Sequence, residues 1–439
     1  MRDAAARAAW LVVGCLALAA LSLLLPWALA FDPWSWVVWG RDVTRFELDT
    51  AGGPSWKPLP VVATTALALG GGTAPALWLV LARAGGLLAV AGALVLARRL
   101  AGTPAAVAAA LAIGLSSWWF FNTALGNSEG LLAAAVLWAV VAHLGGHTRA
   151  ALALALGAAL LRPEAWPFLG LYALWLWRTR RESLGVLALA LLPVPVLWFG
   201  PDVIGVGGAL GASDAARGTA SPQSAVNADV PALEVVVDFA ELLTPPVLVA
   251  AVAGAALGGR TARLLAAGAL AWVALVAVMT QAGYAGNPRY NVAPAAVACV
   301  LAGVGVAAIA GRRWFAGLAL ASVLAAATLA FTAGDLSDQV DELGARADRR
   351  EQLDALVDRA GGPDAVKRCG PVRTNQPMKA MLAWRLDVAM EHLADPPRPP
   401  GAVFRAPPGY DGGPALPAAP GFARVASEGE WELLATCGT

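Results

Sequence analysis

The sequence is short of charge. Charged residues make up 14% of its 439 residues and hydrophobic residues 58%, whereas soluble domains have about 25% charged and about 45–50% apolar residues. A single soluble core cannot bury that much apolar surface, so the composition excludes a soluble enzyme. With a net charge of +1, the chain also lacks the strongly basic character of proteins that bind nucleic acid.

The residue types that usually form metal and nucleophile sites are also scarce. The whole chain has three histidines and four cysteines, and the histidines at positions 143, 147 and 392 are too scattered to predict a histidine metal site. There is no phosphate-binding glycine loop and no serine-nucleophile elbow. The sequence therefore requires no cofactor, and it is compatible with a divalent metal ion.

Long apolar runs fill most of the chain instead. A helix that crosses a bilayer needs about 20 predominantly apolar residues, and many segments approach or exceed that length. We therefore predict an all-α, polytopic membrane protein. About eleven transmembrane helices are expected, near residues 8–30, 76–98, 104–121, 129–145, 149–161, 165–177, 183–199, 242–258, 264–283, 290–310 and 313–333.

The arginines between these runs predict the topology. Short cytoplasmic loops of membrane proteins are enriched in arginine and lysine. Twelve arginines lie at alternate ends of the runs, accompanied there by only two acids, Asp3 and Glu182. The N-terminus is therefore expected in the cytoplasm and the chain from about residue 334 outside it, in a multi-pass plasma-membrane protein. The arginines are Arg2, Arg7, Arg98, Arg99, Arg149, Arg178, Arg180, Arg181, Arg260, Arg263, Arg312 and Arg313.

The segments expected outside hold the most unusual sequence. Residues 1–333 are predicted to form the transmembrane module, with external loops at 31–58 and 200–241. Residues 334–439 are predicted to form a small extracytoplasmic α/β domain, with an amphipathic helix near 336–360, short strands and a proline-rich stretch near 396–420. Cys369 and Cys437 lie in that domain, where the compartment permits a disulfide. Their spacing alone does not establish the bond.

The loop after the first apolar run carries an acid and several tryptophans. Asp32 begins it, ahead of Trp34, Trp36 and Trp39, which suit a short helix in the headgroup region. An aromatic belt with incidental charges explains the tryptophans equally well. However, a carboxylate at the outer surface, fixed by the following proline, is well placed to take a proton from a hydroxyl.

Two basic residues interrupt apolar sequence nearby. Lys57 follows Trp56 and opens an apolar stretch, where it either extends to the interface without further function or binds a lipid phosphate as a point charge. Arg83 lies in an unbroken apolar run. Burying its guanidinium costs roughly 2.5–3.5 kcal/mol, so we expect it to be a structural partner of a neighbouring helix.

Polar residues recur at the later external turns. Arg162 and Glu164 join the fifth and sixth runs, and an interhelical salt bridge is their simplest interpretation. Glu129 opens the fourth run, and Arg289 and Tyr290 lie between the ninth and tenth. For Glu129 and Arg289 we favour a functional role.

The order of these features along the chain resembles that in the GT-C superfamily of integral-membrane glycosyltransferases. They are most similar to the branch that holds protein O-mannosyltransferases and lipid A aminoarabinose transferases, over roughly residues 1–310. Asp32 occupies the position of that branch's catalytic acid, although Pro33 follows it instead of the usual acidic-alanine-arginine run. Residues 334–439 match nothing in the family. The other matching segments are Trp56-Lys57-Pro58-Leu59-Pro60, Leu81-Ala82-Arg83, Ala97-Arg98-Arg99-Leu100, Glu129 and Arg289-Tyr290.

The resemblance implies a GT-C-like fold and a sugar donor carried on a polyprenyl phosphate at the outer leaflet. It implies that Asp32 acts as general base on an acceptor hydroxyl, with inversion at the anomeric carbon and Glu129 as the second catalytic acid. Lys57 and Arg289 would bind the donor phosphate. Membrane lipids surround the protein, and the acceptor is a glycan, a glycolipid or a protein. Trp39, Trp56 and Tyr290 would contact sugar or acceptor, and anchoring at the membrane interface explains each of them equally well. Arg41, Arg83, Arg162 and Glu164 would support the site.

Two other classes of function stay open at this point. A flippase or transporter for a lipid-linked sugar would also have many spans and outer charges. It should need polar groups at mid-membrane or on both faces, and acids are almost absent from the expected cytoplasmic side. A non-catalytic cell-envelope scaffold, with residues 334–439 as its docking module, is the third class.

Overall fold

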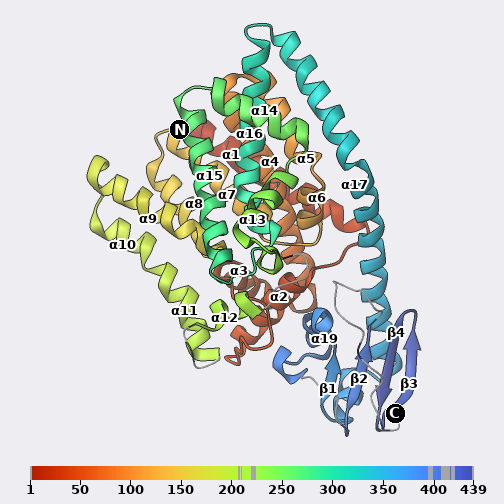
Figure 1. Cartoon of the computed structure of the whole chain (residues 1–439). Coiled ribbons are helices and arrows are strands. Elements are labelled where there is room, and N and C mark those ends of the chain that lie inside the picture. Colours follow the sequence, from red (N-terminus) through yellow and green to blue (C-terminus); the bar gives the residue numbers. More distant parts are fainter. Residues whose placement is uncertain are drawn as a thin grey trace. The chain divides into compact units, whose positions relative to one another are not determined.

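The computed structural model describes residues 2–205, 208, 210–218, 224–393, 399–406, 416 and 421–437. It is 77% helical (Figure 1). The chain forms two compact units, each assembled from three separate stretches. The first unit comprises Met1–Leu24, Val80–Leu197 and Ala216–Val340, and the second Leu25–Leu79, Trp198–Ala215 and Asp341–Thr439.

The first unit is a bundle of apolar helices. Helix α16 lies at its centre and is buried from Val292 to Val306. The helices of this unit are α1 (Arg2–Leu21), most of α4 (Ala74–Ala101), α5 (Thr103–Gly114), α6 (Ser117–Ala124), α7 (Glu129–Leu144), α8 (Thr148–Leu161), α9 (Trp166–Trp175), α10 (Leu184–Leu191), the start of α11 (Pro193–Gly205), the end of α12 (Gly211–Gly218), α13 (Pro231–Glu241), α14 (Pro245–Leu257), α15 (Arg260–Gln281), α16 (Val292–Ala310) and the start of α17 (Trp314–Arg359).

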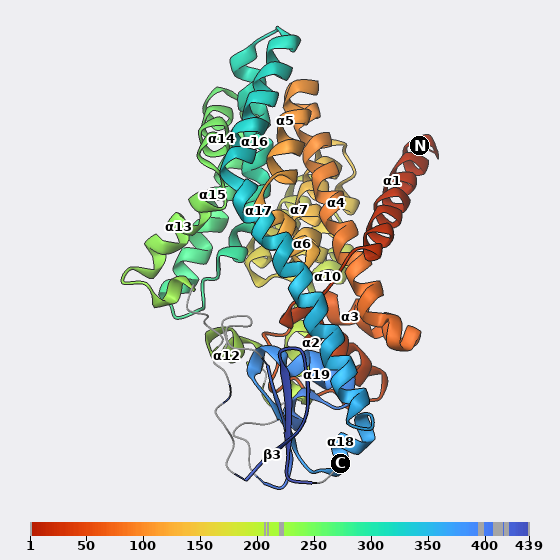
Figure 2. The same cartoon turned by 90° about the vertical axis from the view of Figure 1, so that its right-hand side faces the viewer.

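Small residues allow the central helices to approach closely. A Cβ atom on Gly303 would collide with the carbonyl of Ala105 in α5, and one on Gly305 with the carbonyl of Ala250 in α14. Without such side chains the helix backbones can touch, which is the usual way that membrane helices pack. Helices α14, α16 and α5 accordingly run side by side (Figure 2).

The helices agree with the predicted all-α membrane class. Within the described residues, six helices are long and apolar enough to cross a membrane, or eight if each of two bent helix pairs is one span. Helices α7 and α8 are apolar but shorter, with 16 and 14 residues. The count of eleven spans stays a prediction.

Two expected segments have different boundaries in the structure. The span expected at 104–121 is broken into α5 and α6, which meet at 62°. Gly114 and Ser116 lie at the break, and the Ser116 hydroxyl donates to the carbonyl of Ala112 at 2.6 Å; glycine, serine and such side-chain bonds are common causes of helix kinks. Conversely, the last span and the amphipathic helix after it form one 46-residue helix, α17, because no proline interrupts the chain before Pro363.

The second unit combines two short helices, α2 (Phe31–Thr44) and α3 (Pro58–Leu67), with the C-terminal α/β structure. The sheet has the order β1-β2-β4-β3, in which β1 and β2 are parallel and the other pairs antiparallel. Trp431 is fully buried, and its indole donates to the carbonyl of Arg349 at 2.9 Å, which holds the sheet against α17. The elements are α18 (Pro363–Arg368), β1 (Val372–Thr374), α19 (Lys379–Leu386), β2 (Ala402–Arg405), β3 (Ala423–Glu428) and β4 (Trp431–Ala435).

The small α/β domain expected after residue 334 is therefore present, although its boundary stays a prediction. The structure groups its residues from 341 onward with residues 25–79 and 198–215. Much of the expected proline-rich stretch lies outside the described residues, at 394–398, 407–415 and 417–420. So do residues 206–207, 209 and 219–223 of the expected loop 200–241, whose other parts include α12 and α13.

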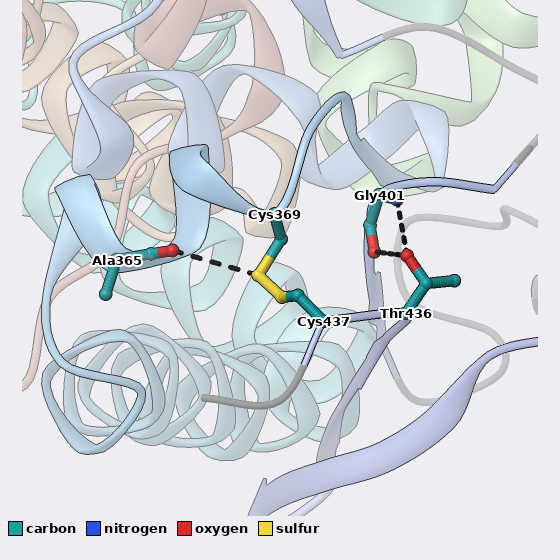
Figure 3. The surroundings of a disulfide bond; sticks show 5 residues. All are labelled: Ala365, Cys369, Gly401, Thr436 and Cys437. Atoms are coloured by element: carbon teal, nitrogen blue, oxygen red, sulfur yellow. Dashed lines mark hydrogen bonds between the residues drawn. A yellow bond between two sulfur atoms is a disulfide. The ribbon is translucent and has the colours of Figure 1, made fainter.

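A disulfide joins the two cysteines of the C-terminal domain (Figure 3). Cys369 follows α18 and Cys437 follows β4, and their Cα atoms are 5.4 Å apart across a sequence separation of 68 residues. Next to it, the Thr436 hydroxyl accepts from the backbone N–H of Gly401 at 2.9 Å. The last strand is thus tied to the segment after α18. Cys15 and Cys299 are buried and free.

Candidate functional site

Helix α2 begins at Phe31, next to the acid that the sequence singled out. Asp32 and Pro33 lie in its first turn. Proline suits this position because its fixed φ is helical and its missing N–H would have no partner within the helix. A carboxylate there is favoured by the positive end of the helix dipole. The side chain of Asp32 is only 9% exposed, so the acid is held in a defined place.

Trp36 and Trp39 follow Asp32 on the same face of α2, one and two turns later. Both are completely buried. The Trp36 ring packs edge-on against Trp78 with centroids 5.4 Å apart, and the Trp39 ring packs against Trp56 at 5.4 Å. These tryptophans belong to the core of the second unit and do not form an exposed aromatic belt.

Lys57 reaches the same face of α2 from the start of α3. It is the residue before Pro58, and its backbone is extended, with φ −134° and ψ 115°, as expected for a residue that precedes proline. Its Nζ lies 5.0 Å from the centroid of the Trp36 ring, and the residue is 6% exposed. The second unit therefore brings a buried ammonium group to the helix face that carries Asp32.

A close crossing of α2 and α3 holds these groups in place. A Cβ atom on Gly40 would lie 2.5 Å from the carbonyl carbon of Thr64, so only glycine allows the helices to touch there. The Thr64 hydroxyl donates to the carbonyl of Trp36 at 2.6 Å. The Trp36 contact lies about one turn from Asp32, and the Gly40 contact just over two turns from it.

Arg41 ties α2 to the C-terminal domain. Its Nη2 donates to Asp42 Oδ1 and to the carbonyl of Val388, both at 2.8 Å, and its Nη1 lies 3.0 Å from Asp387 Oδ1. Arg45 also pairs with Asp387, at 2.8 Å. Arg41 and Asp42 are 6% and 4% exposed, so the α2 side of this contact is largely removed from water, whereas the Asp387 side chain is 54% exposed.

The pKa values of the two acids of this contact, Asp42 and Asp387, are shifted in opposite directions. Burial raises the pKa of Asp42 above its usual value, and the charge and hydrogen bond of Arg41 only partly offset it. Burial acts on Asp387 too. There, however, the hydrogen bond from Arg45 and the charges of Arg41 and Arg45 outweigh it and hold the pKa below its usual value.

The first unit contains a second polar group. Arg162 and Glu164 form a buried, two-pronged ion pair, with Nη2–Oε1 2.6 Å and Nε–Oε2 3.1 Å. The guanidinium also lies 3.7 Å from the centroid of the Tyr290 ring. An ion pair was the expected interpretation of these two residues. It closes the turn that contains η3 (Pro163–Ala165), because its partners are only two residues apart.

Glu129 and Arg289 also belong to this unit. Glu129 is the first residue of α7 and is 1% exposed, and its charge acts on Arg162. Arg289 lies in the short helix η6 (Pro288–Asn291), where the side chain of Asn287 accepts from its backbone N–H at 3.3 Å. The first unit thus gathers Glu129, Arg162, Glu164 and Tyr290.

Arg83 has the structural partners that its apolar surroundings require. Its Nη2 donates to the carbonyl of Ala124 at 2.9 Å, and its Nη1 to the hydroxyl of Ser22 at 2.7 Å. Ala124 ends α6, and the last carbonyls of a helix have no partner within it. Arg83 therefore closes a helix end.

Among the residues that the structure describes, no group of three or more histidine, cysteine, aspartate and glutamate side chains is arranged to hold a metal ion.

Two comparisons by sequence found nothing. No protein-family model matches the chain, and no curated protein matches it. The similarity appears in three dimensions, with crystal structures of ArnT from Cupriavidus metallidurans. The structure bound to undecaprenyl phosphate is 14% identical in sequence, with a TM-score of 0.60, and the match covers 98% of each chain. The apo structure is 16% identical, with a TM-score of 0.59 over 99% of this chain and 98% of the other.

ArnT is a lipid A aminoarabinose transferase with the GT-C fold. The chain has the GT-C fold. The prediction made from residues 1–310 is confirmed for the fold, and the likeness extends further, because 98% coverage includes most of the C-terminal domain that resembled nothing at the level of sequence.

Sequence reasoning missed two acids that contact Arg41 of α2. Arg41 was expected to support the site, but neither Asp42 nor Asp387 was identified as its partner. The adjacency of Arg41 and Asp42 was the available signal. No signal pointed to Asp387, which is 346 positions away from Arg41 and lies on a left-handed backbone position with φ 55°.

Proposed function

We propose that this protein is a membrane glycosyltransferase that moves a sugar from a polyprenyl-phosphate donor to an acceptor hydroxyl at the outer face of the membrane. The observation that carries the proposal is the burial of an acid, Asp32, and of a lysine, Lys57, at one face of α2, in a chain with the GT-C fold. The binding of undecaprenyl phosphate by ArnT supports a polyprenyl phosphate as the donor lipid.

Asp32 is proposed as the general base. Its carboxylate takes the proton of the acceptor hydroxyl while the hydroxyl oxygen attacks the anomeric carbon. The bond between that carbon and the phosphate oxygen breaks, and the polyprenyl phosphate leaves with the bonding electrons. A single displacement of this kind inverts the anomeric configuration. Positioned acid–base groups typically contribute 10²–10⁴-fold to a rate.

Lys57 is proposed to stabilise the charge that develops on the leaving phosphate. An ammonium held against Trp36 and shielded from water acts more strongly than an exposed one, because its field is less screened. The roles expected for Arg289 on the phosphate, for Glu129 as second acid, and for Trp39, Trp56 and Tyr290 at sugar or acceptor are part of the same proposal.

The proposal also places the C-terminal domain outside the cytoplasm. The arginine distribution and the disulfide between Cys369 and Cys437 support this orientation, because disulfides persist in oxidising compartments. The proposed acceptor is a glycan, glycolipid or protein of the cell envelope.

The test is release of polyprenyl phosphate by the purified protein in detergent. Short-chain polyprenyl-phosphate sugars serve as donors and a cell-envelope extract as the source of acceptor. We expect the wild type and Asp364→Asn, a change at an exposed acid of the same unit, to release the lipid phosphate. Asp32→Asn should lose at least about 10²-fold in rate.

Donor binding without release by any variant, across several sugars and acceptors, would contradict a transferase. That result would favour the flippase or the scaffold.

A further inference from the structure

An apolar cavity of about 640 Å³ lies within the first unit, between α7, α8, α9, α15 and α16. Its walls are mainly alanine, aliphatic and aromatic side chains, and His143, Arg260 and Thr261 also line it. Along α15 it extends from Arg260 to Trp272, which at 1.5 Å per residue is about 18 Å. Half of a bilayer's hydrocarbon core is about 15 Å thick. The cavity therefore has the length of one leaflet and suits a hydrocarbon chain.

The two ends of the cavity differ in the polar groups that they offer. At one end, Trp272 already donates its indole N–H to the carbonyl of Tyr290 at 3.0 Å and stacks on Phe168 at 5.4 Å. The neighbouring Arg162 is neutralised by Glu164. This end has no uncommitted cation among its described lining residues.

The opposite end presents a free cation and an aromatic wall. Arg260 lines the cavity there as the first residue of α15, and within the part of the chain that the structure describes it pairs with no acid. Tyr172 and Trp175 stack at 5.6 Å, and the Tyr172 hydroxyl lies 3.1 Å from His143 Nδ1. Tyrosine and tryptophan collect at the level of lipid headgroups. A phosphate bound to Arg260 would lie at that level.

We propose that this cavity binds an anionic phospholipid of the surrounding membrane, with an acyl chain along α15 and its phosphate on Arg260. Basic residues beside a pocket between membrane helices recognise anionic headgroups in this way. The phosphate position on Arg260 involves none of the residues proposed for catalysis or donor binding, so the inference does not depend on the proposed function.

Glycine provides a way to fill the cavity without disturbing the fold. Gly268 lines it, and a Cβ atom added there would meet nothing within 4 Å. Gly268→Leu should therefore occupy the space of the acyl chain. Gly157 in α8 is equally unobstructed but does not line the cavity, so Gly157→Leu is the matched control. Arg263→Gln, in the same helix turn but outside the lining, is the control for Arg260→Gln.

The experiment measures lipid binding to the full-length protein by native mass spectrometry. Delipidated protein is titrated with phosphatidylglycerol or with diacylglycerol of identical chains, which lacks the phosphate. We expect the wild type to bind phosphatidylglycerol more tightly, by roughly tenfold for one charge-assisted contact. Arg260→Gln should lose this preference, and Gly268→Leu should lose one bound lipid of either kind. Both control variants should behave like the wild type.

Equal affinity of the wild type for the two lipids would overturn the proposal, as would full lipid occupancy in Gly268→Leu. Competition with undecaprenyl phosphate tests the remaining explanation, that the cavity holds the polyprenyl chain of the sugar donor. If that lipid displaces phosphatidylglycerol from the wild type and also loses affinity in Gly268→Leu, the cavity belongs to the donor chain and the proposal is wrong.

Discussion

Replacing Arg41 by methionine should destabilise the unit that carries Asp32. The change removes the guanidinium that bonds to Asp42, to Asp387 and to the carbonyl of Val388. It leaves the Asp42 carboxylate, 4% exposed, buried without its cation. Removing one partner of a buried ion pair costs about 3–5 kcal/mol. In a unit of about 170 residues, each kcal/mol lowers the Tm by about 2–4 °C, so the expected loss is roughly 6–20 °C.

Arg45 offers a matched control for Arg41. It binds the same acid, Asp387, but 44% of its side chain is exposed. Exposed ion pairs contribute about 0–1 kcal/mol, so Arg45→Gln should shift the Tm by no more than about 4 °C. Thermal unfolding in detergent, followed by tryptophan fluorescence, measures both variants. The double variant Arg41→Met, Asp42→Leu should recover much of the loss, because an apolar pair can replace a buried ion pair.

Equal shifts for Arg41→Met and Arg45→Gln would refute this reasoning. So would a double variant that is as unstable as Arg41→Met alone, since the cost would then not come from the unpaired Asp42 carboxylate.

Three further predictions follow from the same structure. In the lipid-phosphate release assay, Lys57→Gln should reduce kcat by about 10²–10³-fold, as loss of one preorganised donor does. Lys367→Gln is the control and should leave kcat unchanged, because Lys367 is partly exposed and pairs with Asp364. Replacing Cys369 and Cys437 by serine should destabilise the C-terminal domain by about 4 kcal/mol for a loop of this length, measured by denaturant unfolding; an unchanged midpoint would refute it. The pKa of Asp387 is lower in the folded state than in the unfolded state. Its ionised form therefore contributes stability above the unfolded pKa of about 3.9, and this contribution is lost as the pH falls through the lower, folded-state pKa. Asp387→Asn should therefore flatten the acid limb of the stability curve, and an unaltered limb would show that Asp387 is not responsible.

Much of the fold was predictable because its signals are local. Apolar runs and their arginine-rich ends identify membrane helices without any knowledge of packing. The start of α2 at Asp32-Pro33 and the start of α3 at Lys57-Pro58 follow from proline's preference for helix beginnings. The ion pair of Arg162 and Glu164 was also expected, since the two residues lie in one short turn.

The features that escaped prediction depend on contacts between distant segments. The break between α5 and α6 lies inside an apolar run, where hydropathy does not change. The contact of Arg41 with Asp387 joins parts of the chain that share no sequence pattern. The burial of Trp36 and Trp39 depends on Trp56, Trp78 and the crossing of α2 and α3, whereas the sequence alone suited an interfacial helix equally well.

The proposed function rests most directly on Asp32, and the decisive measurement separates binding from chemistry at that residue. Donor binding and single-turnover transfer are measured on the same sample of wild type and Asp32→Asn. The account predicts that Asp32→Asn binds the polyprenyl-phosphate sugar within a few fold of the wild type and transfers it at least about 10²-fold more slowly. Transfer by Asp32→Asn at nearly the wild-type rate would contradict it.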